Sequence, residues 1–463
     1  MTEETQKLEE IIRLVLSEMT IDFPNNKPSC GIYSSMEEAI NAAYEAQQKL
    51  VTFSMEQRGI FIEAIRNEVR NNVELLSKMA VEETGMGRYE DKIQKNLVVV
   101  NKTPGLEDLK SLAFSGDDGL TVVELSPYGV IGAITPTTNP SETIVCNAIG
   151  MISAGNSVVF SPHPSSKRTS LKTIELINNA IIKAGGPANV TTSVEKPTIA
   201  EAELMMSHKK IRMIVATGGL GVVKAALSTG KKAIGAGAGN PPAVVDETAD
   251  IEKAAKDIID GCSFDNNLPC ISEKEVIVVD QVTDYLLFSM NKHGAYELSE
   301  KEDIQKLMDL VMENGQPKKQ FIGKNADYIL KQLGIDCDAS VRAITMEVEG
   351  DHPFVVKELM MPVLPVVRVN DVDEAIDLAV KVEHGFRHTA IMHSKNVDNL
   401  TKFAKKIQTT VLVKNGPSYA GIGVKGEGYC TFTIAGPTGE GLTSTKDFAR
   451  SRRCVLVDGL SIR

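Results

Sequence analysis

Residues 214–223 read Ile214-Val215-Ala216-Thr217-Gly218-Gly219-Leu220-Gly221-Val222-Val223, an apolar strand pattern that passes through two glycines into a helical pattern. Such a turn lets backbone N–H groups and a helix N-terminus approach a phosphate. The usual G-x-G-x-x-G spacing is absent, so the segment alone is at least as typical of a tight turn without a ligand. What it predicts firmly is one strand–turn–helix unit of an α/β fold.

Strand and helix patterns alternate on both sides of this unit. Strand patterns lie at 120–125, 129–134, 157–160, 190–194 and 212–216, with helical patterns at 170–184 and 199–206. A second alternating block runs from Pro242 to about Gly416. Because such alternation implies parallel sheets covered on both faces, we predict an α/β fold with two parallel-sheet domains at 34–240 and 241–443.

Two further segments predict a small β arm and a tethered helix. A hairpin is expected at about 118–134, and a closing strand within 444–463. At the other end, residues 1–20 place Leu8, Ile11, Ile12, Val15, Leu16 and Met19 on one helical face. Residues 21–33 are rich in helix breakers and read as a linker. The apolar face of this helix needs a partner, either its own domain or another protein.

Composition narrows the class of protein. The chain has 463 residues, 42% hydrophobic and 24% charged, as in ordinary globular proteins. A net charge of −11 argues against a nucleic-acid binder. No apolar run approaches the roughly 20 residues that span a bilayer. Seven scattered cysteines fit free thiols in a reducing compartment. These features predict a cytoplasmic protein without membrane or nucleic-acid partners.

Cys270 stands out among the cysteines because it lies on a polar loop, Ser263 to Cys270, ahead of the strand pattern Glu275–Val279. A thiol on such a loop can meet a substrate. Cys262 instead continues the apolar stripe of the helix that begins near Ile251, so it reads as core packing. A loop cysteine alone is more often an ordinary thiol than a nucleophile.

Two other regions invite a functional reading. Residues 235–242 form a glycine-rich crossing without side-chain bulk, suited to passing beside a cofactor or to a tight crossing between domains. Three histidines, His384, His388 and His393, fall within ten residues. Gly385 interrupts any helix there and no acidic or cysteine ligands accompany them, so we expect no metal.

Several short stretches complete a pattern that no single motif carries. They are Glu83-Thr84-Gly85-Met86-Gly87, Pro136-Thr137-Thr138-Asn139-Pro140, Phe160-Ser161-Pro162-His163-Pro164, Glu358-Leu359-Met360-Met361-Pro362-Val363 and Lys414-Asn415-Gly416-Pro417-Ser418-Tyr419-Ala420-Gly421. With the Thr217-Gly218 turn, the glycine crossing and Cys270, they make the whole chain resemble the aldehyde dehydrogenase superfamily. More narrowly, it resembles the CoA-acylating aldehyde dehydrogenases of bacterial microcompartments.

The resemblance implies a role for each motif. Cys270 would attack an aldehyde, and its backbone N–H and the Asn139 amide would hold the oxyanion. Cofactor binding would fall to Thr217, Gly218, Gly219, Ser161, Pro162, His163 and Glu358, the last as the ribose-binding carboxylate. Without the resemblance, Asn139 reads as a turn residue before Pro140, and Glu358 as a solvated acid. Ser161 stands where many hydrolytic relatives have a lysine, so NAD is expected without excluding NADP.

The nucleophile that releases the acyl group is predicted from an absence in the sequence. Hydrolytic members carry a water-activating glutamate in the glycine crossing, whereas this chain has no Asp or Glu between Gly230 and Asp246. A thiol such as coenzyme A needs less activation than water, so acyl transfer to CoA is expected. His388 is the best candidate for taking the thiol proton, with an inert structural histidine as the alternative.

The resemblance also implies a substrate and an assembly. The substrate would be a short aldehyde, propanal first and acetaldehyde second. The β arm would pair subunits into a homo-oligomer, a dimer or a tetramer. Residues 1–20 would bind a microcompartment shell protein and place the chain inside the shell. Two rivals remain: a CoA-independent aldehyde dehydrogenase, and a non-catalytic cargo or scaffold protein.

Overall fold

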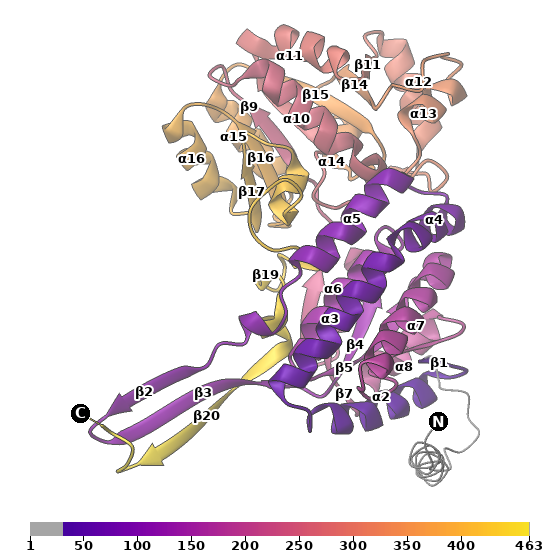
Figure 1. The fold of residues 1–463 in the computed structure, drawn as a ribbon. Coiled ribbons are helices and arrows are strands. Elements are labelled where there is room, and N and C mark those ends of the chain that lie inside the picture. Colours follow the sequence, from indigo (N-terminus) through magenta and orange to yellow (C-terminus); the bar gives the residue numbers. More distant parts are fainter. Residues whose placement is uncertain (1–30, 463) are drawn as a thin grey trace, which may run out of the picture.

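A computed structural model describes residues 31–462 of the chain. Two domains, each built on a parallel sheet, lie one against the other, and a narrow arm projects from the first (Figure 1). The helix predicted at 1–20 lies outside the described residues, as does most of the linker at 21–33. The end of that linker differs from the prediction, because Ile32–Tyr33 forms an edge strand, β1, hydrogen-bonded to Ser193–Val194.

The first domain is a six-stranded parallel sheet with helices on both faces. In sheet order its strands are β1 (Ile32–Tyr33), β6 (Thr191–Val194), β5 (Ser157–Pro162), β4 (Val130–Thr135), β7 (Ile211–Thr217) and β8 (Lys232–Ala236). Its helices are α2 (Met36–Leu50), α3 (Met55–Asn71), α4 (Val73–Thr84), α5 (Tyr89–Lys102), α6 (Pro140–Ser153), α7 (Lys167–Lys183), α8 (Ile199–Ser207) and α9 (Leu220–Leu227), with 3-10 turns η1 (Leu106–Asp108) and η2 (Pro164–Ser166). Every residue of α6 is buried, which places its first turn inside the molecule.

The second domain is a seven-stranded parallel sheet, also covered by helices. In sheet order its strands are β11 (Ala295–Glu297), β14 (Ala343–Glu347), β15 (Val363–Val369), β10 (Glu275–Val279), β9 (Pro242–Val245), β16 (Thr389–His393) and β17 (Val411–Lys414). Its helices are α10 (Ile251–Ser263), α11 (Asp280–Lys292), α12 (Lys301–Val311), α13 (Ala326–Gln332), α14 (Pro353–Val356), α15 (Val372–Val382) and α16 (Val397–Ile407), with the turn η3 (Phe264–Asn267) and the hairpin β12 (Met312–Glu313) and β13 (Gln316–Pro317). The predicted α/β fold with two parallel sheets is confirmed.

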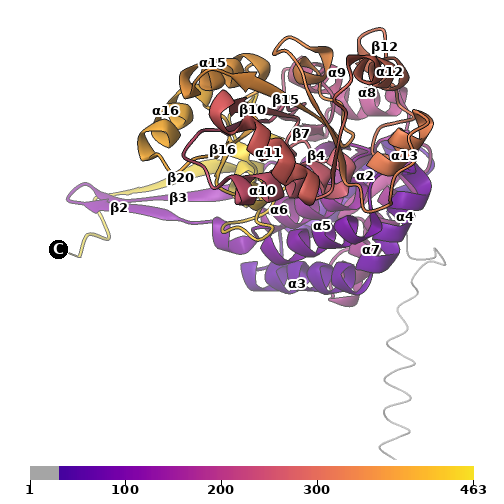
Figure 2. The same cartoon turned by 90° about the horizontal axis from the view of Figure 1, so that it is seen from above.

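The arm is built differently from the prediction. Strand β3 (Gly119–Pro127) pairs antiparallel with β2 (Leu112–Gly116), upstream of it, and with β20 (Ala449–Val457). The predicted hairpin at 118–134 is therefore wrong in its second strand, because β4 enters the middle of the parallel sheet between β5 and β7. Val130 to Ala133 are fully buried there, so the sheet core competes for this apolar strand and wins. Figure 2 shows β2, β3 and β20 extending away from the body.

The C-terminal part of the chain also departs from the predicted boundary at 443. After β17 and the turn η4 (Ser418–Ile422), apolar residues including Cys430, Phe432 and Ile434 join the core of the first domain. The short strands β18 (Ile434–Ala435) and β19 (Gly441–Leu442) and the turn η5 (Thr445–Phe448) lead from there into the arm. The second domain thus ends near β17, and the chain crosses between the domains a second time.

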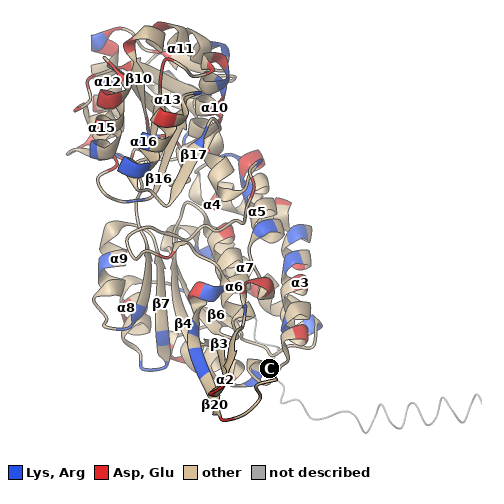
Figure 3. Ribbon diagram, turned by 90° about the vertical axis from the view of Figure 1, so that its left-hand side faces the viewer, with Lys and Arg blue, Asp and Glu red and all other residues tan. Residues whose placement is uncertain are grey.

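Charge is mixed over the surface. Lys and Arg alternate with Asp and Glu along helices of both domains (Figure 3). Among the described residues, no helix is both long and apolar enough to cross a membrane.

Candidate active site

Cys270 lies in the turn between η3, which follows α10, and β10, a strand of the second sheet. Its side chain is partly exposed, whereas Cys262 on α10 is fully buried, as the helical stripe predicted. The three residues Asp265, Asn266 and Asn267 all have left-handed backbone angles, with φ of 48°, 54° and 65°. Non-glycine residues in this region cost about 1 to 3 kcal/mol each and persist only where their surroundings hold them.

Side-chain hydrogen bonds hold this strained turn. Asn266 Nδ2 donates to Gly323 O at 2.9 Å and to Asn325 Oδ1 at 2.7 Å. Asn267 Nδ2 donates to Cys262 O and to Glu273 O, both at 2.9 Å. The backbone that carries Cys270 is therefore fixed from two sides.

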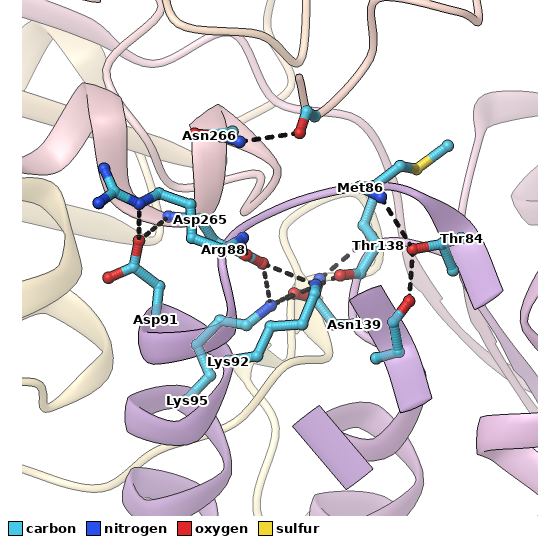
Figure 4. A network of polar contacts seen from close by, with 12 residues as sticks. Thr84, Met86, Arg88, Asp91, Lys92, Lys95, Thr138, Asn139, Asp265 and Asn266 are labelled. Carbon is cyan, nitrogen blue, oxygen red and sulfur yellow. Dashed lines mark hydrogen bonds and ion pairs between the residues drawn. The ribbon is translucent and has the colours of Figure 1, made fainter. Parts of the chain in front are cut away.

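Asn139 is the N-cap residue of α6, and its side chain does not cap the helix. Its Oδ1 instead accepts from Lys95 Nζ at 2.7 Å, and its Nδ2 donates to Thr138 Oγ1 at 3.1 Å. Lys95 in turn contacts Asp265 Oδ2 at 2.7 Å, so Asn139 and the turn before Cys270 are joined through one ammonium group (Figure 4). This agrees with a site role for Asn139 rather than a simple turn residue.

The glycine-rich crossing from β8 to β9 passes between Cys270 and His388. A Cβ atom on Gly239 would lie 2.7 Å from Cys270 O and 3.0 Å from His388 Cγ, closer than real Cβ contacts. Only glycine fits at this position, because the protein itself fills the space. The crossing thus brings the predicted nucleophile and the predicted thiol base into one site.

His388 is 1% exposed and immediately precedes β16. Its Nδ1 lies 2.8 Å from Thr389 Oγ1, and its buried Nε2 has no hydrogen-bond partner in the described structure. Burial, helped by the charge of Lys274, lowers the pKa of His388 to about 4. The lowered pKa favours a neutral His388 at pH 7, and the tautomer whose Nδ1–H donates to Thr389 Oγ1 leaves Nε2 as an acceptor.

Glu358 lies beside the same crossing, with Oε1 3.8 Å from Lys274 Nζ. Burial raises its pKa, against the influence of Lys274 and of the backbone of Gly239. Lys274 is itself anchored, because its Nζ donates to Asn267 O at 2.9 Å and to Asn267 Oδ1 at 2.7 Å. The Glu358 side chain is only 16% exposed, which differs from the solvated acid of the alternative reading.

A pocket of about 460 Å³ adjoins this site. It is lined by six predicted cofactor residues, Ser161, Pro162, His163, Thr217, Gly218 and Gly219, and Glu358 is not among its lining residues. Thr138 and Met360 also line the pocket. Thr138 immediately precedes Asn139 in the chain, and Met360 lies two residues after Glu358. The pocket therefore reaches the region of the predicted chemistry.

The glycine turn of this pocket fits a phosphate-bearing ligand. A Cβ on Gly218 or Gly219 would meet nothing within 4 Å, so these glycines are not required by packing within the chain. Gly219 precedes α9 and provides no side-chain cap, which leaves N–H groups of the first turn to face a ligand. A dinucleotide or a CoA nucleotide suits this arrangement.

Sequence reasoning missed the buried ionic groups around Asn139 and Cys270, namely Lys92, Lys95, Glu142, Asp265 and Lys274. Asp265 lies in the polar loop Ser263 to Cys270, where the sequence pattern indicates no role for it. A lysine on an amphipathic helix is usually exposed to solvent, so the sequence does not reveal that Lys92 and Lys95 are buried. Between residues 31 and 462, no group of three His, Cys, Asp or Glu side chains is arranged to hold a metal. His384 contacts Val356 O at 3.0 Å instead of joining His388.

Comparison with known proteins identifies the family. Residues 27–429 match the aldehyde dehydrogenase family. The chain belongs to this family. A propanal dehydrogenase (CoA-propanoylating) of Citrobacter freundii is 48% identical, over 99% of this chain and 100% of its own.

Two solved structures of aldehyde dehydrogenases are similar throughout. A propionaldehyde dehydrogenase of Rhodopseudomonas palustris, with bound CoA and an acylated cysteine, superposes with a TM-score of 0.93 at 60% identity, covering 94% of this chain and 100% of that chain. A propionaldehyde dehydrogenase from the fucose utilisation microcompartment of Clostridium phytofermentans gives a TM-score of 0.92 at 54% identity, with the same coverage. The predicted resemblance to the CoA-acylating branch is confirmed.

The thiol of Cys270 is expected to hold its proton in the free enzyme. Burial and the nearby Glu358 raise its pKa to about 12, against weaker opposing effects of Lys274 and of the Cys270 N–H. Since the thiolate is the reactive form, alkylation by iodoacetamide should accelerate about tenfold per pH unit between pH 7 and 9. The rate, followed by peptide mass with Cys270→Ala as the blank, would contradict this expectation if it levelled off below pH 8.

Proposed function

We propose that this aldehyde dehydrogenase oxidises a short-chain aldehyde, preferably propanal, to its acyl-CoA thioester with NAD⁺ as hydride acceptor. The observation that carries the proposal is the crossing between β8 and β9. It has no acid between Gly230 and Asp246, and Gly239 fills the space between Cys270 and His388. A carboxylate base for water has no place at this point, whereas a thiol nucleophile does not need one.

The first step is attack of the Cys270 sulfur on the aldehyde carbon. The S–C bond forms as the carbonyl π bond breaks, and the thiol proton of Cys270 passes to solvent water, as the one proton that the overall reaction releases. Negative charge then develops on the aldehyde oxygen, where the Cys270 N–H and one N–H of Asn139 Nδ2 donate to it. The Lys95 contact at Oδ1 supports this role, because it leaves Nδ2 as the donor end of the amide.

The pocket residues bind and orient the hydride acceptor. Thr217, Gly218 and Gly219 would hold its phosphates, Ser161, Pro162 and His163 would line the same pocket, and Glu358 would accept hydrogen bonds from ribose hydroxyls. When bound, the nicotinamide supplies the acceptor for the hydride of the thiohemiacetal. Cys270 is left as a thioester.

The last step transfers the acyl group from Cys270 to CoA. The CoA sulfur forms the new thioester bond, the bond to Cys270 Sγ breaks, and Cys270 takes up a proton. His388 Nε2 accepts the proton of the CoA thiol, because its neutral form at pH 7 and its empty acceptor position leave it able to do so. The balance is aldehyde, NAD⁺ and CoA giving acyl-CoA, NADH and one proton.

Steady-state NADH formation from propanal and NAD⁺, measured with and without CoA, tests the proposal. We expect CoA to raise turnover by at least about 100-fold, because water attack on the thioester lacks a base. Propionyl-CoA should appear in equal amount to NADH. Sustained formation of free propanoate without CoA would instead establish the hydrolytic alternative.

The assembly is proposed on the same footing. The arm carries exposed apolar side chains, Leu112 and Phe114 on β2 and Val455, Leu456 and Val457 on β20, which suit pairing with another subunit in a dimer or tetramer. Residues 1–20 would bind a shell protein and direct the enzyme into a microcompartment. Light scattering of the full chain, and co-sedimentation with shells with and without residues 1–20, are the measurements that decide these points.

A further inference from the structure

A buried ionic network joins the two domains next to Asn139, and Figure 4 shows its members Lys92, Lys95 and Asp265. It consists of Lys92 and Lys95 on α5, Glu142 on α6 and Asp265 in the turn before Cys270. Asp265 Oδ2 lies 3.0 Å from Lys92 Nζ and 2.7 Å from Lys95 Nζ, and Glu142 Oε1 lies 3.1 Å from Lys95 Nζ. The side chain of Lys92 is 1% exposed, and those of Lys95, Glu142 and Asp265 are fully buried.

The network is balanced in charge, with two ammonium groups and two carboxylates. Buried ions are costly even when paired, so such a group is weak evidence of stability and invites a positional explanation. Burial disfavours the ammonium of Lys95, but Asp265 and Glu142 outweigh it and raise its pKa. Likewise, the two lysines outweigh burial and lower the pKa of Asp265. Burial lowers the pKa of Lys92, against the attraction of Asp265. Lys95 and Asp265 are thus expected to be charged at neutral pH.

We propose that Lys95 and Asp265 are positioning residues that orient the Asn139 amide toward the substrate oxygen beside Cys270. An ammonium group can donate but cannot accept a hydrogen bond. The Lys95 ammonium at Asn139 Oδ1 therefore excludes the flipped amide, because the flip would place the Nδ2 donor against the ammonium, which is also a donor. One Nδ2 hydrogen is used by Thr138 Oγ1, and the other is left for the developing oxyanion.

Asp265 extends the same control to the nucleophile. Its Oδ1 accepts from Arg88 N at 2.8 Å, and its own N–H donates to Asp91 Oδ2 at 2.9 Å. A Cβ on Gly87 would lie 2.1 Å from Asp265 Oδ1, so the glycine of the Glu83–Gly87 motif makes room for this carboxylate. The left-handed turn that carries Cys270 is therefore fixed to the first domain at Asp265, the residue that also holds Lys95.

One set of ion pairs thus sets the relative position of the oxyanion donor, on α6 of the first domain, and the nucleophile, on a turn of the second. This inference rests on the proposed function, since it assigns a role in the aldehyde oxidation. Its distinctive consequence is that Lys95 should act through Asn139 and not independently of it.

The test is a double-mutant cycle on the purified full-length enzyme. Lys95→Met alone would leave a buried carboxylate unpaired, so the variant is Lys95→Met/Glu142→Gln, which removes one charge of each sign and keeps the Lys92–Asp265 pair. The readout is the rate of the first NADH turnover with propanal and saturating NAD⁺. We expect this variant and Asn139→Ala each to slow that rate by about 100-fold, as for loss of an oxyanion donor.

The triple variant should be no slower than Asn139→Ala by more than about threefold, because coupled residues are not additive. Alkylation of Cys270, which develops no oxyanion, should change by less than about fivefold, since Lys95 has only a minor effect on the thiol. An unchanged first turnover in Lys95→Met/Glu142→Gln, or a triple loss equal to the product of the two separate losses, would overturn the proposal. Lost alkylation with a lowered melting temperature would do so too, because it would show a purely structural role.

Lys102→Met is the matched control. Lys102 lies on the same helix and donates partly buried hydrogen bonds to Gly423 O at 2.6 Å and Gly426 O at 2.7 Å, away from the network. It should lower thermal stability while keeping the first-turnover rate within about threefold of wild type. The wild-type enzyme, assayed for CoA-dependent thioester formation in the same series, separates failure of this inference from failure of the proposed function.

Discussion

Replacing Cys270 by Ala is expected to abolish aldehyde-dependent NADH formation, with a loss of rate on the order of 10⁴-fold or more. Removing a covalent nucleophile leaves only the residual effects of binding and of the oxyanion donors. The variant should keep its oligomeric state and melting temperature, because Cys270 is only partly buried in a turn held by other residues. Activity is measured from NADH absorbance and assembly by light scattering.

Cys337→Ala is the control for this substitution. Cys337 is also partly exposed and lies beyond α13, outside the catalytic turn. It should retain full turnover. Unchanged activity in Cys270→Ala would show that Cys270 is not the nucleophile. A wild-type protein that forms no NADH from aldehyde, while it assembles normally, would favour the alternative of a cargo or scaffold protein.

Replacing His388 by Gln should separate the two halves of the reaction. We expect transfer of the acyl group to CoA to slow by about 10²- to 10⁴-fold, the usual contribution of a general base. The first NADH turnover should remain within a few fold of wild type, because hydride transfer precedes the CoA step. Stopped-flow measurement of the NADH burst and of the later CoA-dependent rate distinguishes these phases.

The pH dependence of the CoA step follows from the lowered pKa of His388, about 4. Protonation of His388 would remove its acceptor nitrogen, but only as the pH falls toward 4. Between pH 6 and 8 the transfer rate should therefore show no decline from histidine protonation. A decline centred near pH 6.5 in wild type, absent from His388→Gln, would contradict this assignment. His384→Gln, an exposed change in the same loop, should leave both phases unaltered.

The sequence was sufficient to predict features that depend on local pattern. Cys262 and Cys270 were separated by whether a helical stripe included them, and the structure buries the first and leaves the second in a turn. The strand–turn–helix unit at Thr217 was also predicted locally, but its cofactor role came from the family resemblance. Ser161, Pro162 and His163 reached the same pocket only through the family resemblance.

Features decided by distant partners were not predictable in this way. The strand 130–135 and the strand before it are joined by a short turn, which favours a hairpin locally, yet the parallel sheet buries Val130 and Ile131 and takes the strand. The return of Phe432 and Ile434 to the first core gives no local signal at all. Lys95 and Asp265 are far apart in the chain, so neither their contact nor their burial could be read from the local sequence.

The acyl-enzyme on Cys270 is the central claim and can be observed directly. Enzyme mixed with propanal and NAD⁺ without CoA, quenched in acid and digested, should yield the Cys270 peptide with the mass of one added propanoyl group. Addition of CoA before the quench should remove that mass and release propionyl-CoA in equal amount. An unmodified Cys270 peptide in the absence of CoA, while NADH is formed, would contradict the thioester pathway.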